Sequence, residues 1–241
     1  METRRRVSIF VPAYNELANL EGAIRDIVSA AEAVLDDYEI LLVDDGSTDG
    51  TGALGDRLAR EHPKIRVIHQ ESNQGIAAGY TRALGEATME YFSFLPADQE
   101  ISPQSIKNIL TAVGTADIVV PYHANTLARP LYRRFLTRVS TSLINALFGL
   151  RLRYFQGPSI YPTPRARALP KTAGGFYFLT QMLVHALRAG HSYTEVGLIH
   201  QEREHGRSKA VSLRNILRAL RTIAALWWAI HVKRVSLHRG T

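Results

Sequence analysis

Short β-branched segments alternate with longer amphipathic segments through the first half of the chain, and this alternation constrains the fold most strongly. The candidate strands are residues 7–12, 39–43, 66–69, 91–95 and 117–121. Segments with apolar residues at helical spacing fill the first three gaps, at residues 16–35, 48–61 and 75–87. This order of elements predicts an α/β fold, in which helices flank a mostly parallel sheet.

Polar residues follow each of the first four predicted strands directly. The four loops read PAYNE from residue 12, DDGSTDGT from residue 44, NQG from residue 73 and PADQE from residue 96. In any single loop, Asp and Ser are also common as turn and helix-cap residues. The carboxyl ends of parallel strands meet at one edge of a sheet, where such proteins bind ligands. Four polar loops at that edge therefore favour a shared ligand crevice.

The charged residues are distributed unevenly along the chain. Residues 1–128 contain 10 Lys and Arg against 19 Asp and Glu, whereas residues 129–241 contain 19 against 3. A basic half of this kind is either a solvated surface or a surface for anions, such as phosphorylated substrates and acidic lipid headgroups. The acidic first half argues against nucleic acid as a partner.

Three further features bound the class of protein. The absence of cysteine excludes disulfides and thiolate metal sites, and it fits a reducing compartment. The longest stretch without Asp, Glu, Lys or Arg is the 16 residues 172–187, whereas a bilayer span needs about 20 apolar residues. The basic start runs directly into the first predicted strand instead of an apolar signal segment. We therefore expect a cytoplasmic protein without a transmembrane helix.

The loop sequences resemble the nucleotide-sugar half of family 2 glycosyltransferases, which have the Rossmann-like GT-A fold. The resemblance rests on VSIFVPAYNE at residues 7–16, VDDGSTDGT at residues 43–51 and NQG at residues 73–75. REHGRSK at residues 203–209 is most similar to the polyprenyl-phosphate group, the dolichol-phosphate mannosyltransferase type. The resemblance implies an inverting transferase that moves a sugar from a nucleotide-diphosphate donor to a dolichyl or undecaprenyl phosphate. Such an enzyme would work peripherally, at the inner face of the membrane.

The resemblance assigns the first three loops to the nucleotide. Asp45 would accept a hydrogen bond from the base, and Asn73 and Gly75 would let the backbone approach the nucleotide. A helix cap and a plain turn are the alternative interpretations of these residues. Residues 203–209 would close over the donor diphosphate. The expected donor-binding residues are Pro12, Tyr14, Asn15, Glu16, Asp45, Asn73, Gly75, Asp98, Arg203, Ser208 and Lys209.

The fourth loop departs from the family pattern for metal binding. Family members usually carry a DxD motif, whose carboxylates hold Mg²⁺ or Mn²⁺ against the sugar diphosphate. Here Pro96 replaces the first Asp, and Glu100 stands where the polyprenyl-phosphate enzymes often have Gln. Carboxylates at positions i and i+2 can still share one Mg²⁺ with the diphosphate and water. We expect Asp98 and Glu100 to bind Mg²⁺ or Mn²⁺, with a solvated surface acid as the alternative for Glu100.

A second departure concerns the acceptor. Family members usually have an acid near residues 154–161, but this chain has Gln156 and no acid between Asp117 and Glu195. A sugar hydroxyl benefits from a base, whereas a phosphomonoester is already anionic at neutral pH. The missing acid favours a phosphate acceptor, or a role as base for Glu195 or Glu202. The expected catalytic residues are Asp98, Glu100, Arg138 and Gln156.

Two segments of the basic half have amphipathic patterns. Residues 129–148 predict either an interfacial helix whose Arg residues bind an acceptor phosphate or an ordinary helix with a solvated basic face. The expected acceptor-phosphate residues are Arg129, Arg134, Arg138 and Ser142. In the helix predicted at residues 211–232, Trp227 and Trp228 indicate an anchor at lipid headgroups. The alternative for this helix is core packing or a homodimer contact.

The expected organisation is a GT-A domain at residues 1–210 followed by an amphipathic basic helix at residues 211–241. One rival function is a soluble family 2 transferase that acts on a saccharide hydroxyl in polysaccharide or glycolipid synthesis. Another is a catalytically silent nucleotide-sugar binding protein, because Pro96 and Gln156 depart from the family pattern. A dehydrogenase is disfavoured, because no GxGxxG turn follows the first strand.

Overall fold

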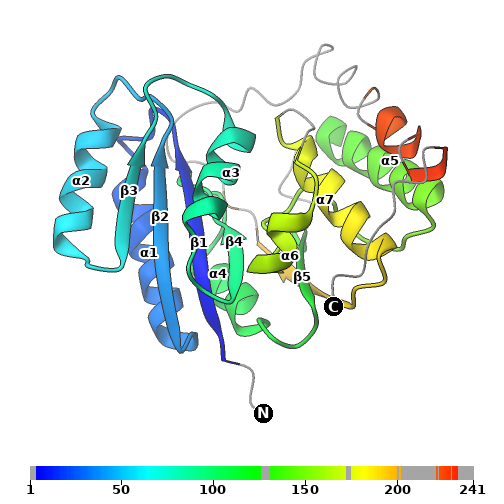
Figure 1. Ribbon diagram of the computed structural model, residues 1–241, viewed down its shortest axis with the longest axis horizontal. Helices are drawn as coiled ribbons and strands as arrows, with labels where there is room; N and C mark the ends of the chain where they lie inside the picture. The colour runs from blue at the N-terminus through cyan, green and yellow to red at the C-terminus, as the bar shows by residue number, and fades with distance from the viewer. Residues whose placement is uncertain are drawn as a thin grey trace.

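The computed structural model describes residues 4–125, 131–171, 175–199, 201, 221, 223–228 and 230–232, without the side chain of Arg133. Strands and helices alternate along the first half of the chain (Figure 1). The strands are β1 (Arg6–Ala13), β2 (Asp37–Asp44), β3 (Ile65–His69), β4 (Tyr91–Phe94), β5 (Ile118–His123), β6 (Tyr161–Pro162) and β7 (Tyr193–Leu198). The helices are α1 (Leu20–Val34), α2 (Thr51–Glu61), α3 (Ile76–Glu86), α4 (Pro103–Thr111), α5 (Leu131–Phe148), α6 (Thr163–Ala168) and α7 (Tyr177–Arg188).

A sheet of five strands in the order β3-β2-β1-β4-β6 forms the centre of the molecule. Its first four strands are parallel, and β6 runs antiparallel to β4. The predicted mostly parallel α/β sheet is therefore confirmed, and the four polar loops leave from its carboxyl edge.

The fifth predicted strand lies outside this sheet. It forms β5, which pairs in parallel with β7 in a separate sheet of two strands. A single bridge connects the two sheets within the described residues, where Val119 and Ile160 exchange backbone hydrogen bonds of 3.1 and 3.0 Å. The short strand β6, which follows Ile160 directly, takes the place beside β4.

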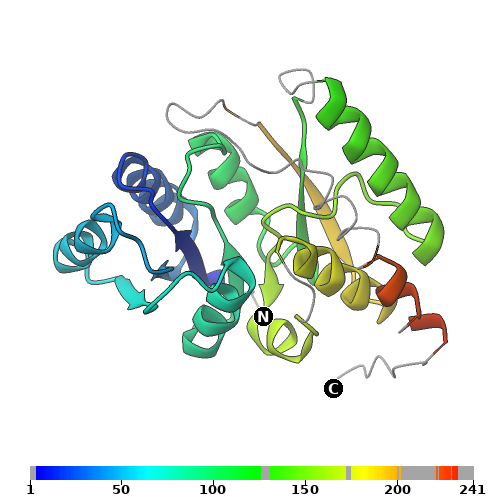
Figure 2. The same cartoon turned by 90° about the horizontal axis from the view of Figure 1, so that it is seen from above.

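Helices cover both faces of the sheet. Successive side chains of a strand point to opposite faces, so β1 contributes Ile9 to one hydrophobic layer and Phe10 to the other. Helices α1, α2 and α4 pack on the Ile9 layer, and α3, α5, α6 and α7 pack on the Phe10 layer. Figure 2 shows α2 in light blue and α5 in green at opposite ends of the molecule.

Helices α1 and α2 begin later than their apolar patterns indicate, because loop residues hold the preceding backbone in turns. Asp49 Oδ1 accepts hydrogen bonds from the N–H of Thr51 at 2.9 Å and from its hydroxyl at 2.6 Å. Before α1, Asn15 has a left-handed φ of 55°. Glu16 O then accepts from the N–H of Leu20, the first residue of the helix, at 2.9 Å.

Glu39 of β2 is buried near the amino ends of the central strands, away from the polar loops. It accepts hydrogen bonds from Ser8 Oγ and from Thr88 N, both at 2.6 Å, and from Thr88 Oγ1 and Arg66 Nη2, both at 2.8 Å. Burial opposes ionisation of Glu39, but these bonds outweigh it and hold the pKa of the carboxyl below its ordinary value. This carboxylate fastens β1, β2, β3 and the α3–β4 connection together.

Part of the predicted C-terminal helix is described, at residues 221, 223–228 and 230–232. Trp227 and Trp228 are exposed, and the ring of His231 lies 6.0 Å from that of Phe148 at the end of α5. This segment, drawn in red, therefore packs beside α5 (Figures 1 and 2). None of the described helices has the length and apolarity that crossing a membrane requires. The C-terminal segment buries three residues in the Phe10 layer: Ile223, Leu226 and Ile230.

Candidate active site

The first and second loops are joined by hydrogen bonds. The Asn15 N–H donates to Ser47 Oγ at 3.0 Å, and Asn15 Oδ1 accepts from the Thr48 N–H at 2.9 Å. Asp44, the last residue of β2, accepts from the Ser47 N–H at 3.0 Å through Oδ1. Asn15, which was predicted to bind the sugar donor, therefore uses its side-chain oxygen to join the first loop to the second.

Asp45 holds the third loop to the second. Its Oδ1 accepts from the Gln74 N–H at 2.7 Å, and its Oδ2 accepts from the Gly75 N–H at 2.8 Å. Gly46 allows this close approach, because its φ is +72° and a Cβ built on it would lie 2.7 Å from Ser72 Cα. A carboxylate offers about four acceptor positions. The residue predicted to bind the base thus positions the third loop and also has acceptor capacity for a ligand.

The remaining predicted residues of these loops differ in exposure. Tyr14 and Asn73 are exposed, whereas Pro12 is half-buried and pairs with Val43 of β2. The side chain of Glu16 accepts a hydrogen bond from Asn19 Nδ2 at 2.8 Å, within the turn that precedes α1. Tyr14 is therefore the aromatic side chain that these loops expose at the carboxyl edge of the sheet.

His69, at the end of β3, is a site residue that no sequence pattern singles out. Its Nδ1 lies 3.2 Å from Asp44 Oδ2, and its Nε2 lies 3.0 Å from Asp56 Oδ1 of α2. The hydrogen bond with Asp56, together with that of Asp44, outweighs burial and raises the pKa of His69 above its ordinary value. His69 therefore connects α2 with the base of the second loop.

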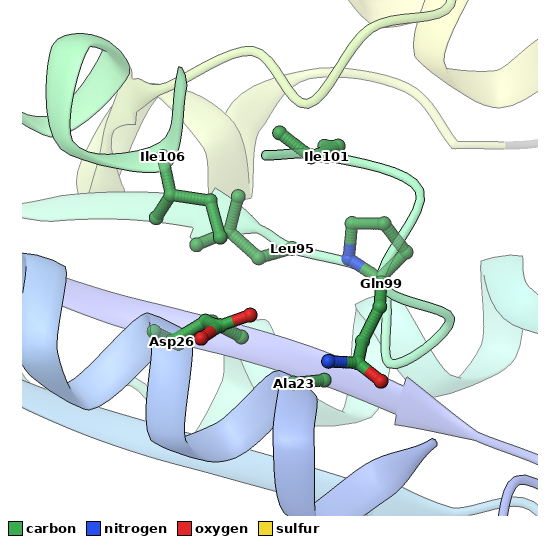
Figure 3. A pocket seen from close by; sticks show the side chains of 8 residues that line it. Ala23, Asp26, Leu95, Gln99, Ile101 and Ile106 are labelled. Carbon is green, nitrogen blue, oxygen red and sulfur yellow. The ribbon is translucent and has the colours of Figure 1, made fainter. Parts of the chain in front are cut away.

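The fourth loop carries Asp98 and Glu100, and Asp98 Oδ1 accepts from the Glu100 N–H at 3.2 Å. Between them, Gln99 has a left-handed φ of 53° and extends its side chain toward Ala23 of α1 (Figure 3). It lines a cavity of about 10 Å³ there. A Cβ built on Gly22 would lie 2.5 Å from Gln99 Nε2, so the side chain packs tightly on the helix. Gln99 thus anchors the fourth loop to α1.

The two carboxylates of the fourth loop match the donor chemistry of a hard divalent cation. Mg²⁺ is commonly bound through one or two protein carboxylates, with its other ligands from substrate phosphates and water. The described residues contain no group of three or more His, Asp or Glu that could form a metal site from protein ligands alone. Asp98 and Glu100 therefore fit a cation that arrives with a diphosphate.

The segment after β7 runs beside the fourth loop. The Ser102 N–H donates to Ile199 O at 3.2 Å, the Ile199 N–H donates to Ser105 Oγ at 2.8 Å, and the Gln201 N–H donates to Glu100 O at 2.8 Å. Gln201 is thus bonded to the loop that carries the two acids. The predicted donor residues Arg203, Ser208 and Lys209 lie outside the described residues.

Helix α5 carries the described part of the predicted acceptor-phosphate set. Arg138 and Ser142 are exposed and one turn apart, and Arg134 is half-buried one turn earlier. The three residues share one side of the helix. Arg129 lies outside the described residues.

Gln156 and Glu195, the two residues weighed near the acceptor, are both engaged. Gln156 hydrogen-bonds to Tyr177, the first residue of α7; burial raises the pKa of Tyr177, and this bond opposes the rise. Glu195 accepts from the Arg153 N–H at 2.9 Å and lies 3.6 Å from Arg153 Nε. Its contact with Arg153 disfavours Glu195 as a base. Glu202 lies outside the described residues.

A mostly parallel sheet with polar, carboxylate-bearing loops at its carboxyl edge is the arrangement of the GT-A fold. Residues 8–166 match the sequence model of Glycosyl transferase family 2. The chain belongs to that family, and its sequence matches show that it is a nucleotide-sugar-dependent glycosyltransferase.

Two similar proteins align with most of the chain. The undecaprenyl-phosphate mannosyltransferase of Micrococcus luteus is 28% identical over 218 residues, covering 85% of this chain and 87% of that protein. The polyprenol monophosphomannose synthase of Mycolicibacterium smegmatis is 30% identical over 251 aligned positions, covering 98% and 91%.

The fold is similar to that of glucosyl-3-phosphoglycerate synthase from Mycobacterium tuberculosis. The structure of that enzyme with Mn²⁺, UDP and phosphoglyceric acid has a TM-score of 0.67 at 19% identity, over 93% of this chain and 78% of that one. Its structure with Mg²⁺ and UDP has a TM-score of 0.65 at 18% identity, over 91% and 80%. At these identities the likeness establishes the shared GT-A fold.

Proposed function

We propose that this protein transfers a sugar, with inversion, from a nucleotide-diphosphate sugar to a polyprenyl phosphate at a membrane surface. The observation that carries this proposal is the exposed apolar stripe of α5, because cations border it. Leu131 is 76% exposed and Phe135 is 67% exposed. The stripe, at intervals of one turn, consists of Leu131, Phe135, Val139 and Leu143.

The opposite side of α5 is buried, so the exposure of the stripe does not reflect a detached helix. Ile144 and Phe148 belong to the Phe10 layer. Arg138 and Ser142 each precede a stripe residue directly in the sequence and are exposed. An exposed apolar stripe bordered by cations suits a lipid surface, and a guanidinium can donate two parallel hydrogen bonds to a phosphate.

The C-terminal segment carries a second set of exposed side chains that suit a lipid surface. Trp227 and Trp228 are exposed on the helix that packs beside the end of α5. Indole side chains favour the depth of lipid headgroups, because the ring is largely apolar and its N–H is polar. The indoles therefore add a further lipid contact to the stripe of α5 in this proposal.

The absence of a free base at Glu195 fits a phosphate acceptor, because of how the reaction proceeds. An oxygen of the acceptor phosphate forms a bond to the anomeric carbon of the sugar. The bond from that carbon to the donor diphosphate breaks, and the nucleoside diphosphate leaves with the electron pair. A phosphomonoester has a second pKa of about 6 and is anionic at neutral pH, so it needs no base. A saccharide hydroxyl would need one, and Arg153 engages Glu195.

At the donor, we assign Asp45 and the exposed Tyr14 to the nucleotide base. Asp98 and Glu100 would hold Mg²⁺ or Mn²⁺, which neutralises charge on the leaving diphosphate. Arg203, Ser208 and Lys209 would close over the same diphosphate. The hydrogen bond between the Gln201 N–H and Glu100 O supports this closure. Gln201 precedes Arg203 by two residues, so the chain reaches the fourth loop just before the predicted closing segment.

The test is incubation with labelled nucleotide sugars together with undecaprenyl phosphate, dolichyl phosphate or saccharide acceptors. A lipid-phosphate product supports the proposal, and a saccharide product would establish the rival transferase instead. Donor binding without any product would indicate a silent binding protein. Arg138→Gln should reduce lipid transfer at least about tenfold, as expected for losing an interaction with a charged group. Arg25→Gln, at an exposed position of α1, is the matched control and should leave transfer unchanged.

A further inference from the structure

The two carboxylates at His69 contact different ring nitrogens. Asp44 Oδ2 lies 3.2 Å from Nδ1, and Asp56 Oδ1 lies 3.0 Å from Nε2. A neutral imidazole has one N–H, so its other nitrogen presents a lone pair to the facing carboxylate. Only the imidazolium form donates to both acids. Protonated His69 can therefore donate one hydrogen bond to Asp44 of β2 and one to Asp56 of α2, and so links both elements to β3.

Helix α2 packs closely against Asp44 and the edge of the His69 ring, although 48% of the His69 side chain stays exposed. A Cβ built on Gly52 would lie 2.5 Å from Asp44 Oδ2 and 3.3 Å from His69 Cε1. Asp44 itself is buried, with 7% of its surface exposed. Because little water reaches Asp44, its ionised carboxylate depends on the hydrogen bonds that the protein supplies.

Asp44 also forms a hydrogen bond with the second donor loop, so its position affects that loop. Its other oxygen, Oδ1, accepts from the Ser47 N–H at 3.0 Å. Ser47 Oγ in turn accepts from the Asn15 N–H at 3.0 Å, where the backbone has a left-handed φ of 55°. A continuous chain of hydrogen bonds thus runs from Asp56 through His69, Asp44 and Ser47 to Asn15.

We propose that His69 is a positioning residue of the donor site: as imidazolium it fixes Asp44, and through Asp44 and Ser47 it orders the first two donor loops for nucleotide binding. This inference rests on the proposed donor site. His69 itself need not touch the nucleotide, because its effect reaches the first loop through the carboxylate of Asp44.

Two carboxylates contact the ring: Asp44, which ends β2, and Asp56 on α2. The neighbouring charged residues of the chain are Arg60, one turn after Asp56, and Glu71, in the loop after β3. Arg60 and Glu71 are exposed, so solvent and salt screen them. Asp44, which is buried, and Asp56, which is 48% exposed but contacts Nε2 directly, are therefore the groups that most affect the protonation of the ring.

The direction of the pH dependence follows from this geometry. The pKa of His69 is raised in the folded protein, so the stabilisation by its protonated form is present at low pH. It is lost as the pH rises through that raised pKa. Nucleotide affinity should therefore be higher below this pKa than above it.

Calorimetric titrations with UDP and GDP between about pH 5.5 and pH 8.5 test the proposal. The wild type should lose about fivefold in affinity as His69 deprotonates, the lower end of typical couplings between two sites. His69→Gln should bind weakly throughout, with this loss absent. His62→Gln, which removes an exposed histidine at the end of α2, is the matched control and cancels titration of the nucleotide phosphates. If His69 has a purely structural role, His69→Gln should have a lower melting temperature but the same pH dependence of nucleotide affinity as the wild type. That result would overturn the proposal.

Nuclear magnetic resonance of the nucleotide-free protein gives an independent readout. The Ser47 amide should titrate with the midpoint of the His69 ring, and Asp56→Asn should move both midpoints to lower pH. A Ser47 amide that ignores His69 would refute the hydrogen-bond chain. If the wild type binds neither nucleotide at any pH, the donor assignment fails and this inference fails with it. If nucleotides bind with a profile independent of His69, this inference alone fails.

Discussion

Replacing Asp45 with alanine removes the carboxylate that joins the second and third loops. Its oxygens accept from the Gln74 N–H at 2.7 Å and from the Gly75 N–H at 2.8 Å. A hydrogen bond to a charged group typically contributes about 1.5–3 kcal/mol. Gln74 is exposed, so water can replace its bond, whereas Gly75 is half-buried. We therefore expect the free energy of unfolding to fall by about 2–3 kcal/mol, less than the sum of two such bonds.

Urea unfolding measures this loss as a lower midpoint with an unchanged slope. Asp36→Ala is the matched control: Asp36 is exposed and accepts one hydrogen bond, from the Arg5 N–H at 2.7 Å. It should cost about 1 kcal/mol or less. Calorimetry with UDP and GDP should show weaker binding by Asp45→Ala, because the third loop is released. Unchanged stability together with an unchanged nucleotide Kd would refute the role of Asp45 in joining the loops.

Three further predictions follow from other parts of the structure. Glu39→Gln should lower the free energy of unfolding by about 2 kcal/mol, because the buried carboxylate accepts hydrogen bonds from Ser8, Arg66 and Thr88. Since the pKa of Glu39 is lowered, its contribution is present above its unfolded pKa and is lost as the pH falls through the lowered value; urea unfolding of the variant should therefore vary less with acid pH. Asp98→Ala should abolish transfer and Mg²⁺-dependent donor binding in calorimetry, and full wild-type activity in excess chelator would contradict a metal role. Replacing Phe135 and Val139 together with Ser should abolish flotation with anionic liposomes, whereas Tyr193→Ser, at an exposed aromatic residue of β7, should not; equal flotation of both variants would argue against the stripe as the lipid contact.

The central sheet was predictable because its elements carry local signals. Each strand of the first half is a short apolar run, and the intervening helices repeat apolar residues at helical spacing. Helix α7 was not predicted, because most of its own residues between Phe178 and Ala186 are buried, including the polar Thr180 and His185. Strand β7 also lacked a clear pattern, since its central residues are half-buried. The pairing of β5 could not be predicted for the same reason, because its partner β7 has no clear pattern.

Within the candidate site, the loop sequences predict which residues lie at the carboxyl edge of the sheet but not all of their contacts. Asp45 bonds to residues about 30 positions later in the chain, and no local pattern reports that pairing. In the sequence, His69 is only the last residue of a predicted strand. The tertiary structure places Asp44 and Asp56 against its two ring nitrogens. Tyr177 is likewise defined by its contact with Gln156. Side chains whose roles depend on distant partners therefore need the tertiary structure.

The bridge between Val119 and Ile160 has a consequence for how the two sheets stay together. Two backbone hydrogen bonds are the strand pairing that connects β5 and β7 to the sheet of the donor loops, within the described part of the chain. Side chains supply the rest of the connection, because Val119 lies in the Ile9 layer and Ile118 lies in the Phe10 layer. The position of β5 against the donor loops is therefore set mainly by packing, which a change in side-chain volume on β5 would disturb.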